Sequence, residues 1–216
     1  MRYNTVIFDL DGTLLNTLQD LWRATNHALE QRGYPVRTLE EVRRFVGNGV
    51  EMLIRRAVPA GCAEEEIQAA LAVFKAYYAR HNNDTTAPYD GIEELLARLK
   101  ARGVRMAIVS NKNDPNVKAL AKLYFPTTIS LAVGEGNGVR PKPCPDSVLH
   151  VMSQWHCSPQ QVLYVGDSDV DIRTAENAGV DCASVCWGFR GEEELRAAGA
   201  RVLVHTAQEL ERCVEG

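Results

Sequence analysis

The chain has 216 residues, of which 45% are hydrophobic and 24% are charged, a composition typical of soluble globular proteins with one or two domains. Its formal net charge is −4, which argues against a nucleic-acid-binding protein. No apolar run is long enough to span a membrane, and the N-terminal segment has no signal-peptide layout. We therefore expect a cytoplasmic protein without a nucleic-acid or membrane partner. The six scattered cysteines are interpreted as reduced thiols.

The first part of the chain combines one short strand pattern with a long helical region. Residues 6–8 are apolar and predict a β-strand. From residue 17 to about residue 83 the pattern is helical, with apolar runs at helical spacing that begin at Leu18, Val42 and Ile67. This region predicts an all-helical segment inserted after the first strand.

The remainder alternates short apolar runs with amphipathic stretches. Strands are predicted over residues 104–109, 129–133, 162–165, 182–186 and 202–204. Helices are predicted over residues 92–99, 114–123, 145–155, 169–178 and 208–214. This alternation predicts parallel strands joined by right-handed crossovers, hence an α/β fold with a doubly wound, Rossmann-like sheet. We assign residues 1–15 and 89–216 to this core and residues 16–88 to the helical insertion.

Acidic residues follow the first predicted strand. In doubly wound sheets ligands bind at the carboxyl ends of the strands, and Asp9 and Asp11 stand at that position. Two close carboxylates repel each other, and a hard cation such as Mg²⁺ relieves that repulsion. A polar turn accounts for Asp11 and Gly12, but not for Asp9, which follows three apolar residues.

Three later segments complete a possible phosphate site. Ser110 and Asn111 offer a hydroxyl and backbone amides to a phosphate oxygen, although they could be cap residues of the next helix, with Asp114 as the cap. Lys142 lies between two prolines that stiffen its backbone, although most lysines are solvated. The acids of residues 167–171 follow an apolar strand, although acids also favour helix starts. Phosphate with Mg²⁺ satisfies all these groups, and an aspartyl-phosphate is an established intermediate.

These segments together resemble the haloacid dehalogenase-like superfamily over nearly the whole chain. The resemblance rests on four motifs in the family's order, Asp9-Leu10-Asp11-Gly12-Thr13, Ser110-Asn111, Lys142-Pro143 and Gly166-Asp167 to Asp171. Within the superfamily the chain is most similar to the bacterial phosphoglycolate phosphatases, through Thr13-Leu14-Leu15-Asn16-Thr17, Phe45-Val46-Gly47-Asn48-Gly49-Val50 and Val109-Ser110-Asn111-Lys112. One difference is Asn16, where the family usually has Asp.

The resemblance implies a role for each motif residue. Asp9 would be the nucleophile, and Asp11 would be the general acid and then the general base. Lys142 would neutralise Asp9 and the phosphate. Asp9, the backbone carbonyl of Asp11 and the side chain of Asp167 would bind Mg²⁺. Asp171 would anchor Lys142 or a metal-bound water.

The resemblance also implies where a substrate binds. Its phosphate and substrate contacts would come from Thr13, Asn48, Ser110, Asn111 and Lys142. The helical insertion would be a cap that closes over the site and reads the leaving group. Asn48 and its two flanking glycines could equally be a break between helices.

We therefore expect a Mg²⁺-dependent phosphatase that hydrolyses a small phosphorylated metabolite, with phosphoglycolate as the leading candidate, in a monomer or homodimer. The same site could belong to a pyrophosphatase, a sugar phosphate phosphatase or a phosphomutase. A non-catalytic phosphate-binding protein is less favoured, because Asp9, Asp11 and Lys142 are all present.

Overall fold

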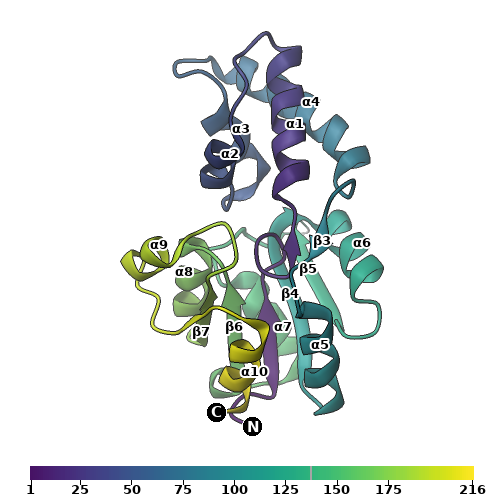
Figure 1. Ribbon diagram of the computed structural model, residues 1–216, viewed down its shortest axis with the longest axis vertical. Coiled ribbons are helices and arrows are strands. Elements are labelled where there is room, and N and C mark those ends of the chain that lie inside the picture. Colours follow the sequence, from purple (N-terminus) through teal and green to yellow (C-terminus); the bar gives the residue numbers. More distant parts are fainter. Residues whose placement is uncertain (137) are drawn as a thin grey trace. The chain divides into compact units, whose positions relative to one another are not determined.

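The computed structural model describes residues 1–136 and 138–216, and its contacts divide the chain into two compact units (Figure 1). The core unit comprises Met1–Leu14 and Pro88–Gly216, and the helical unit comprises Leu15–Ala87. The two segments where the chain passes from one unit to the other pair as short strands, β2 (Leu15–Asn16) with β3 (Ala87–Pro88).

The core unit is built on a six-stranded parallel sheet in the order β5-β4-β1-β6-β7-β8. Its strands are β1 (Thr5–Phe8), β4 (Arg105–Asn113), β5 (Leu131–Glu135), β6 (Val162–Gly166), β7 (Asp181–Val185) and β8 (Leu203–Val204). The chain adds β4 and β5 on one side of β1 and then crosses to add β6, β7 and β8 on the other. The strand order therefore reverses beside β1, which is where doubly wound sheets bind ligands. The predicted doubly wound parallel sheet is confirmed.

Helices cover both faces of this sheet (Figure 1). They are α5 (Ile92–Ala101), α6 (Asp114–Tyr124), α7 (Asp146–Trp155), α8 (Asp169–Ala178), α9 (Glu192–Ala197) and α10 (Ala207–Glu215), with a short 3₁₀ helix at Pro159–Gln161. Helix α7 packs against α8, and α5 against α10. Ile7, Ala107 and Tyr164 are partners in register on three neighbouring strands, so their side chains lie on the same face of the sheet. All three belong to a buried cluster that also contains residues of α7 and α8.

Two local predictions in the core unit were wrong, and one helix was missed. Strand β4 continues to Asn113 instead of ending at residue 109, because it pairs with β5 again at Glu135 after a shift in register. The cap of α6 is Asn113, since the carboxylate of Asp114 instead accepts a hydrogen bond from the backbone N–H of Gly134 at 3.0 Å. Helix α9 was not predicted, because only Leu195 among its six residues is buried.

The helical unit has its own hydrophobic core, to which all four of its helices contribute. These are α1 (Leu18–Gln31), α2 (Leu39–Phe45), α3 (Gly49–Ala57) and α4 (Glu64–His81). The second predicted apolar run forms two helices, because Gly47, which lies between them, takes a φ angle of 129° that an α-helix does not allow. None of the described helices has the length and apolar character needed to cross a membrane.

Candidate active site

A buried carboxylate stands at the carboxyl end of the central strand. The backbone N–H of Asp9 donates to the carbonyl of Val165 at 2.8 Å, which continues the pairing of β1 with β6. The residue is only 8% exposed. Its Oδ1 accepts from the Lys142 ammonium at 2.9 Å. Asp9 is thus held between the end of β1 and a buried cation that comes from a distant part of the sequence.

Lys142 is fixed through both its backbone and its side chain. The Asn111 side chain donates to the Lys142 carbonyl at 3.0 Å and accepts from the Lys142 N–H at 2.7 Å. The Lys142 ammonium donates to Asp171 Oδ1 at 2.7 Å and to the Tyr164 hydroxyl at 3.1 Å. Tyr164 in turn donates to Asp171 at 3.0 Å. The ammonium therefore has a single well-defined position beside Asp9.

Asp167 lies in a space that glycines make possible. It follows β6, and its carboxylate accepts from the Thr13 hydroxyl at 3.3 Å and from the Phe189 N–H at 2.6 Å. A Cβ atom added at Gly12 or at Gly188 would lie 2.3 Å from an atom of the Asp167 side chain. Gly12 also has a φ angle of +89°, which favours glycine.

Three buried carboxylates gather at this point. Asp9, Asp167 and Asp171 each place a carboxylate oxygen within 4.8 Å of the others. Burial raises the pKa of Asp9 to about 7, in spite of the opposing charge of Lys142. Burial and the charges of Asp171 and Asp9 also raise the pKa of Asp167 well above its ordinary value. One ammonium does not balance three carboxylates, so the site can accept a further cation.

The chemistry of these donors determines which cation fits. All three offer carboxylate oxygen, the donor that Mg²⁺ and other hard divalent ions prefer. Although burial alone lowers the pKa of Lys142, the charges of Asp171 and Asp9 raise it well above the ordinary value. The lysine therefore stays a cation beside Asp9 and does not compete as a neutral ligand.

The Asp11 side chain faces a second buried lysine. Lys112 Nζ lies 2.9 and 3.0 Å from the two carboxylate oxygens of Asp11, and the Lys112 side chain is only 3% exposed. Ser110 and Lys112 lie two residues apart on β4, in the stretch where its pairing with β5 shifts register. The sequence analysis did not select Lys112 as a site residue, although it stands in the segment Val109-Ser110-Asn111-Lys112 that carries the resemblance.

The predicted phosphate contacts divide between the units. Ser110 is buried in the core unit, where its hydroxyl accepts from the Lys112 N–H at 3.2 Å. Thr13 and Asn111 also lie in the core unit, bonded to Asp167 and Lys142 as described. Asn48 belongs to the helical unit, where it stands at the N-cap position of α3 and its carboxamide oxygen accepts from Arg56 at 2.8 Å. The break between helices expected as an alternative for this segment is present.

A loop after β7 also contributes, and sequence reasoning missed it. Besides the Phe189 N–H on Asp167, the indole N–H of Trp187 donates to the Thr13 carbonyl at 3.0 Å. Both residues follow a parallel strand at the edge where Asp9 and Asp167 lie. Inspection of the residues after every predicted strand could have identified this loop.

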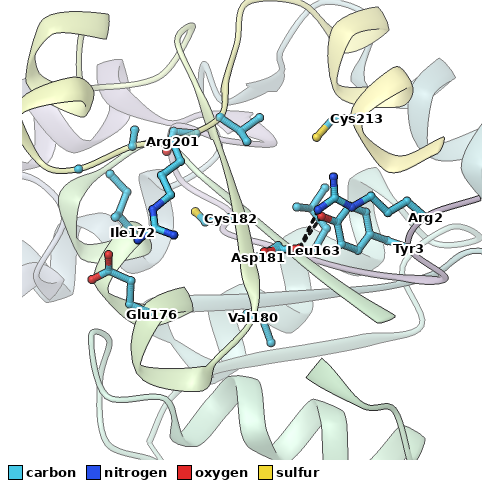
Figure 2. A pocket seen from close by; sticks show the side chains of 14 residues that line it. Arg2, Tyr3, Leu163, Ile172, Glu176, Val180, Asp181, Cys182, Arg201 and Cys213 are labelled. Carbon is cyan, nitrogen blue, oxygen red and sulfur yellow. Dashed lines mark hydrogen bonds and ion pairs between the residues drawn. The ribbon is translucent and has the colours of Figure 1, made fainter. Parts of the chain in front are cut away.

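A pocket of about 440 Å³ lies elsewhere in the core unit (Figure 2). It is lined near the first residues of β6 and β7 by Leu163 and Asp181. Asp181 accepts there from the Tyr3 hydroxyl at 2.7 Å and pairs with Arg2 at 3.3 Å. Because ligands of doubly wound sheets bind at the opposite, carboxyl ends of the strands, we place the candidate site at the carboxylate cluster.

Comparisons with known proteins agree with this fold. The model of the haloacid dehalogenase-like hydrolases matches residues 6–185. Phosphoglycolate phosphatase 1 of Pseudomonas aeruginosa is 33% identical over 216 residues, which cover 97% of this chain and 79% of that protein. A crystal structure described as a "putative phosphoglycolate phosphatase", from Lactobacillus delbrueckii subsp. bulgaricus, is 36% identical with a TM-score of 0.95, and the match covers 99% of each chain.

A phosphate complex is also among the similar structures. CbbY from Rhodobacter sphaeroides, crystallised with phosphate, is 27% identical with a TM-score of 0.75 over 96% of each chain. The family model alone matches well over half of the residues. The chain therefore belongs to the haloacid dehalogenase-like hydrolase family.

Proposed function

We propose that this hydrolase is a Mg²⁺-dependent phosphomonoesterase that works through an aspartyl-phosphate on Asp9, with phosphoglycolate as its substrate. The observation that carries the proposal is the buried Asp9 carboxylate, 2.9 Å from the ammonium of Lys142 and grouped with Asp167 and Asp171. A nucleophilic carboxylate needs a fixed position and neighbouring positive charge to approach a phosphate dianion.

The reaction divides into two displacements at phosphorus. In the first, an Asp9 oxygen forms a bond to phosphorus, the bond from phosphorus to the ester oxygen breaks, and Asp11 gives a proton to the leaving oxygen. In the second, Asp11 takes a proton from a water molecule whose oxygen attacks phosphorus. The bond from phosphorus to Asp9 then breaks, which restores the free carboxylate and releases inorganic phosphate.

The surrounding residues bind and orient the phosphate. The Ser110 hydroxyl and the Asn111 backbone amide are assigned to a phosphate oxygen, and Lys142 to the charge shared between phosphate and Asp9. Asp9, Asp167 and the backbone carbonyl of Asp11 would hold Mg²⁺. When bound, this cation compensates the negative charge of the carboxylates and of the phosphoryl oxygens.

The names of the relatives support phosphoglycolate as the substrate. Relatives with that name are about one-third identical over nearly the whole chain. The helical unit follows β1, at whose carboxyl end Asp9 lies, as expected for a cap that contacts the leaving group and so selects the substrate. We assign recognition of the leaving group to Asn48 and Arg56, which are hydrogen-bonded at 2.8 Å. The leaving group is a small anionic alcohol, and both side chains offer it polar groups.

The test is kcat/KM across phosphoglycolate, pyrophosphate, sugar phosphates and p-nitrophenyl phosphate with Mg²⁺. We expect the highest value for phosphoglycolate. A preference for pyrophosphate, or isomerised sugar phosphate without free phosphate, would replace the substrate assignment but leave the covalent step in place.

The covalent step has its own test. Asp9→Asn should lower kcat by at least about 10⁴-fold, since the nucleophile is lost. Asp84→Asn, which changes an exposed acid paired with His81 at 2.8 Å, is the control and should retain activity. Turnover at the wild-type rate by folded Asp9→Asn would refute the aspartyl-phosphate.

A further inference from the structure

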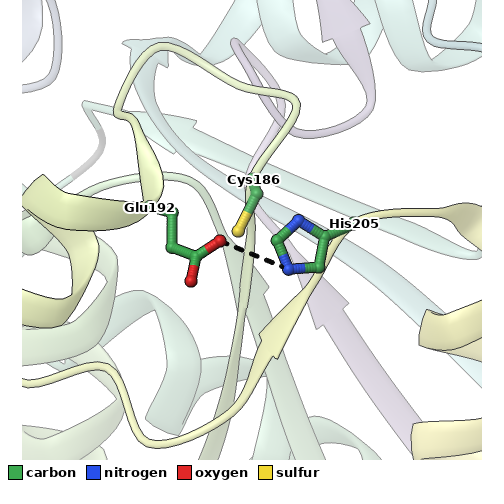
Figure 3. Close-up of side chains that lie close together, drawn as sticks. All are labelled: Cys186, Glu192 and His205. Carbon is green, nitrogen blue, oxygen red and sulfur yellow. Dashed lines mark ion pairs between the residues drawn. The ribbon is translucent and has the colours of Figure 1, made fainter.

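Three chemically different side chains meet beyond the carboxyl ends of β7 and β8. Cys186 directly follows β7, Glu192 is the first residue of α9, and His205 directly follows β8. None of the three belongs to the carboxylate cluster of the candidate active site. Figure 3 shows the Cys186 sulfur directed at the space between the Glu192 carboxylate and the His205 ring.

The three side chains lie close enough together to reach one metal ion. One ligand atom from each of the three side chains lies within 4.8 Å of the other two. His205 Nε2 and Glu192 Oε2 are already 3.5 Å apart. Ligands at zinc bond lengths in a tetrahedron are separated by about 3.3–3.8 Å. The 3.5 Å between the histidine and glutamate atoms falls within this range.

Residues around the cluster hold two of its members in place. Arg196 donates to the other carboxylate oxygen of Glu192 at 2.6 and 2.9 Å, which holds the carboxylate in place while Oε2 faces His205. A second carboxylate, Glu209, accepts from the backbone N–H of His205 at 2.7 Å. Hydrogen bonds of this outer kind orient the ligands in many metal sites.

We propose that Cys186, Glu192 and His205 bind a borderline divalent ion of the Zn²⁺ type, with water as the fourth ligand. One sulfur, one imidazole nitrogen and one carboxylate oxygen suit zinc, whereas Mg²⁺ prefers oxygen alone. Cys186 and Glu192 stand at the two ends of residues 187–191, the loop whose Phe189 N–H holds Asp167. The ion would therefore join both ends of a loop that contacts the candidate active site.

The experiment is a titration of the metal-free full-length protein with Co²⁺, a spectroscopic substitute for zinc, in excess Mg²⁺. We expect one Co²⁺ per chain, a near-ultraviolet thiolate-to-cobalt absorption band, and displacement of Co²⁺ by Zn²⁺. Cys186→Ser should abolish the band. His205→Ala and Glu192→Gln should weaken Co²⁺ binding by at least about tenfold.

Two matched variants serve as controls. Cys213→Ser removes another thiol of the core unit, and Glu193→Gln removes the acid next to Glu192, so both should leave the band and the affinity unchanged. Circular dichroism checks that each variant is folded, and the exposed His205 variant tests the proposal if Cys186→Ser does not fold. The absence of the band in the wild type, its persistence in Cys186→Ser or its loss in Cys213→Ser would each overturn the proposal.

Discussion

At the scale of single residues, the ion pair of Lys112 with Asp11 has the clearest consequence for catalysis. Lys112 contacts both Asp11 oxygens and is almost completely buried, so it determines where the proposed acid and base group lies. Lys112→Met should lower kcat by about 10²-fold, the cost of a misplacement of about 1 Å, with a smaller change in KM. The measurement is steady-state kinetics on phosphoglycolate and on p-nitrophenyl phosphate.

The two substrates separate a positioning role from a general loss of structure. p-Nitrophenolate leaves without needing a proton, so the formation of the aspartyl-phosphate should depend less on Asp11 for this substrate than for an alkyl phosphate. Lys118→Met, which removes an exposed lysine paired with Asp114 at 2.7 Å, is the control. Equal losses on both substrates in the first displacement, measured as a burst, would contradict the positioning role.

The site could be predicted from the sequence only where a residue type is unusual for its place. Asp9 and Asp167 are acids directly after apolar strands, and the structure brings them together with Lys142 and Asp171. Tyr164 is different, because a tyrosine within an apolar strand is ordinarily a packing residue. Its contact with Lys142 depends on the position of its hydroxyl, at the far end of the side chain, which no sequence pattern reveals.

At the scale of elements, substitution of its glycines tests whether the loop of residues 187–191 holds Asp167 in place. A Cβ atom at Gly188 would lie 2.3 Å from the Asp167 Cβ and 2.4 Å from the Gly12 carbonyl. Gly188→Ala should therefore displace the loop and weaken its support of Asp167. We expect a Mg²⁺ concentration for half-maximal activity that is about 10- to 100-fold higher, the usual cost of losing support around a metal ligand. A Mg²⁺ titration of activity measures it.

Gly191 provides the matched control at the other end of the same loop. A Cβ atom there would meet only Glu194 Oε2, at an ordinary distance of 3.7 Å. Gly191→Ala should leave the Mg²⁺ requirement unchanged. If both variants, or neither, changed that requirement, the close packing of Gly188 on Asp167 would not explain the role of the loop.

A buried carboxylate of helix α1 binds the segment that follows α4. Asp20 accepts hydrogen bonds from the backbone N–H groups and the hydroxyls of Thr85 and Thr86. Burial alone raises the pKa of Asp20, but these bonds outweigh it and leave the pKa below its ordinary value. A depressed pKa stabilises the fold above the unfolded value of about 3.9, and this stabilisation is lost as pH falls through the folded value.

Asp20→Asn should therefore lower the free energy of unfolding at pH 7 by roughly 1–3 kcal/mol, the cost of unsatisfied buried donors. As pH falls from the unfolded pKa of about 3.9 through the lower folded pKa, the difference from the wild type should narrow, because the wild-type side chain then loses its charge too. Urea denaturation at several pH values measures both effects. Asp84→Asn, at an exposed residue paired with His81, should change little, and a constant difference at all pH values would contradict the role assigned to the Asp20 charge.

Element types could be predicted more reliably than element ends. Helix α8 begins and ends where the alternating pattern placed it, at Asp169–Ala178, because Gly179 at its end takes a φ of 70° that stops the helix. Strand β4 extends past its apolar run to Asn113, since pairing with β5 resumes there. The end of a strand depends on the neighbouring strand with which it pairs, and the local hydrophobic pattern does not show where that pairing stops.

At the scale of the whole molecule, charge is unevenly distributed. The net charge of −4 is modest for the 216 residues, yet three carboxylates and one ammonium are concentrated in a single buried site. The proposed ligands, Asp9, Asp11 and Asp167, all belong to the core unit, and none comes from Leu15–Ala87. A cation at this site should consequently stabilise one unit directly and leave the internal contacts of the other unchanged.

Metal removal tests this division. Chelation should abolish turnover, and Mg²⁺ at 100 times its dissociation constant should stabilise the core unit by about 2.7 kcal/mol. Hydrogen exchange should then show Mg²⁺-dependent protection in β1 and β6, whereas the amides of α1 and α4 should exchange at the same rate with and without Mg²⁺. Ca²⁺ should inhibit, because it favours longer bonds and higher coordination. Full activity in excess chelator would contradict the metal requirement, and equal protection of both units would contradict a site built from the core unit alone.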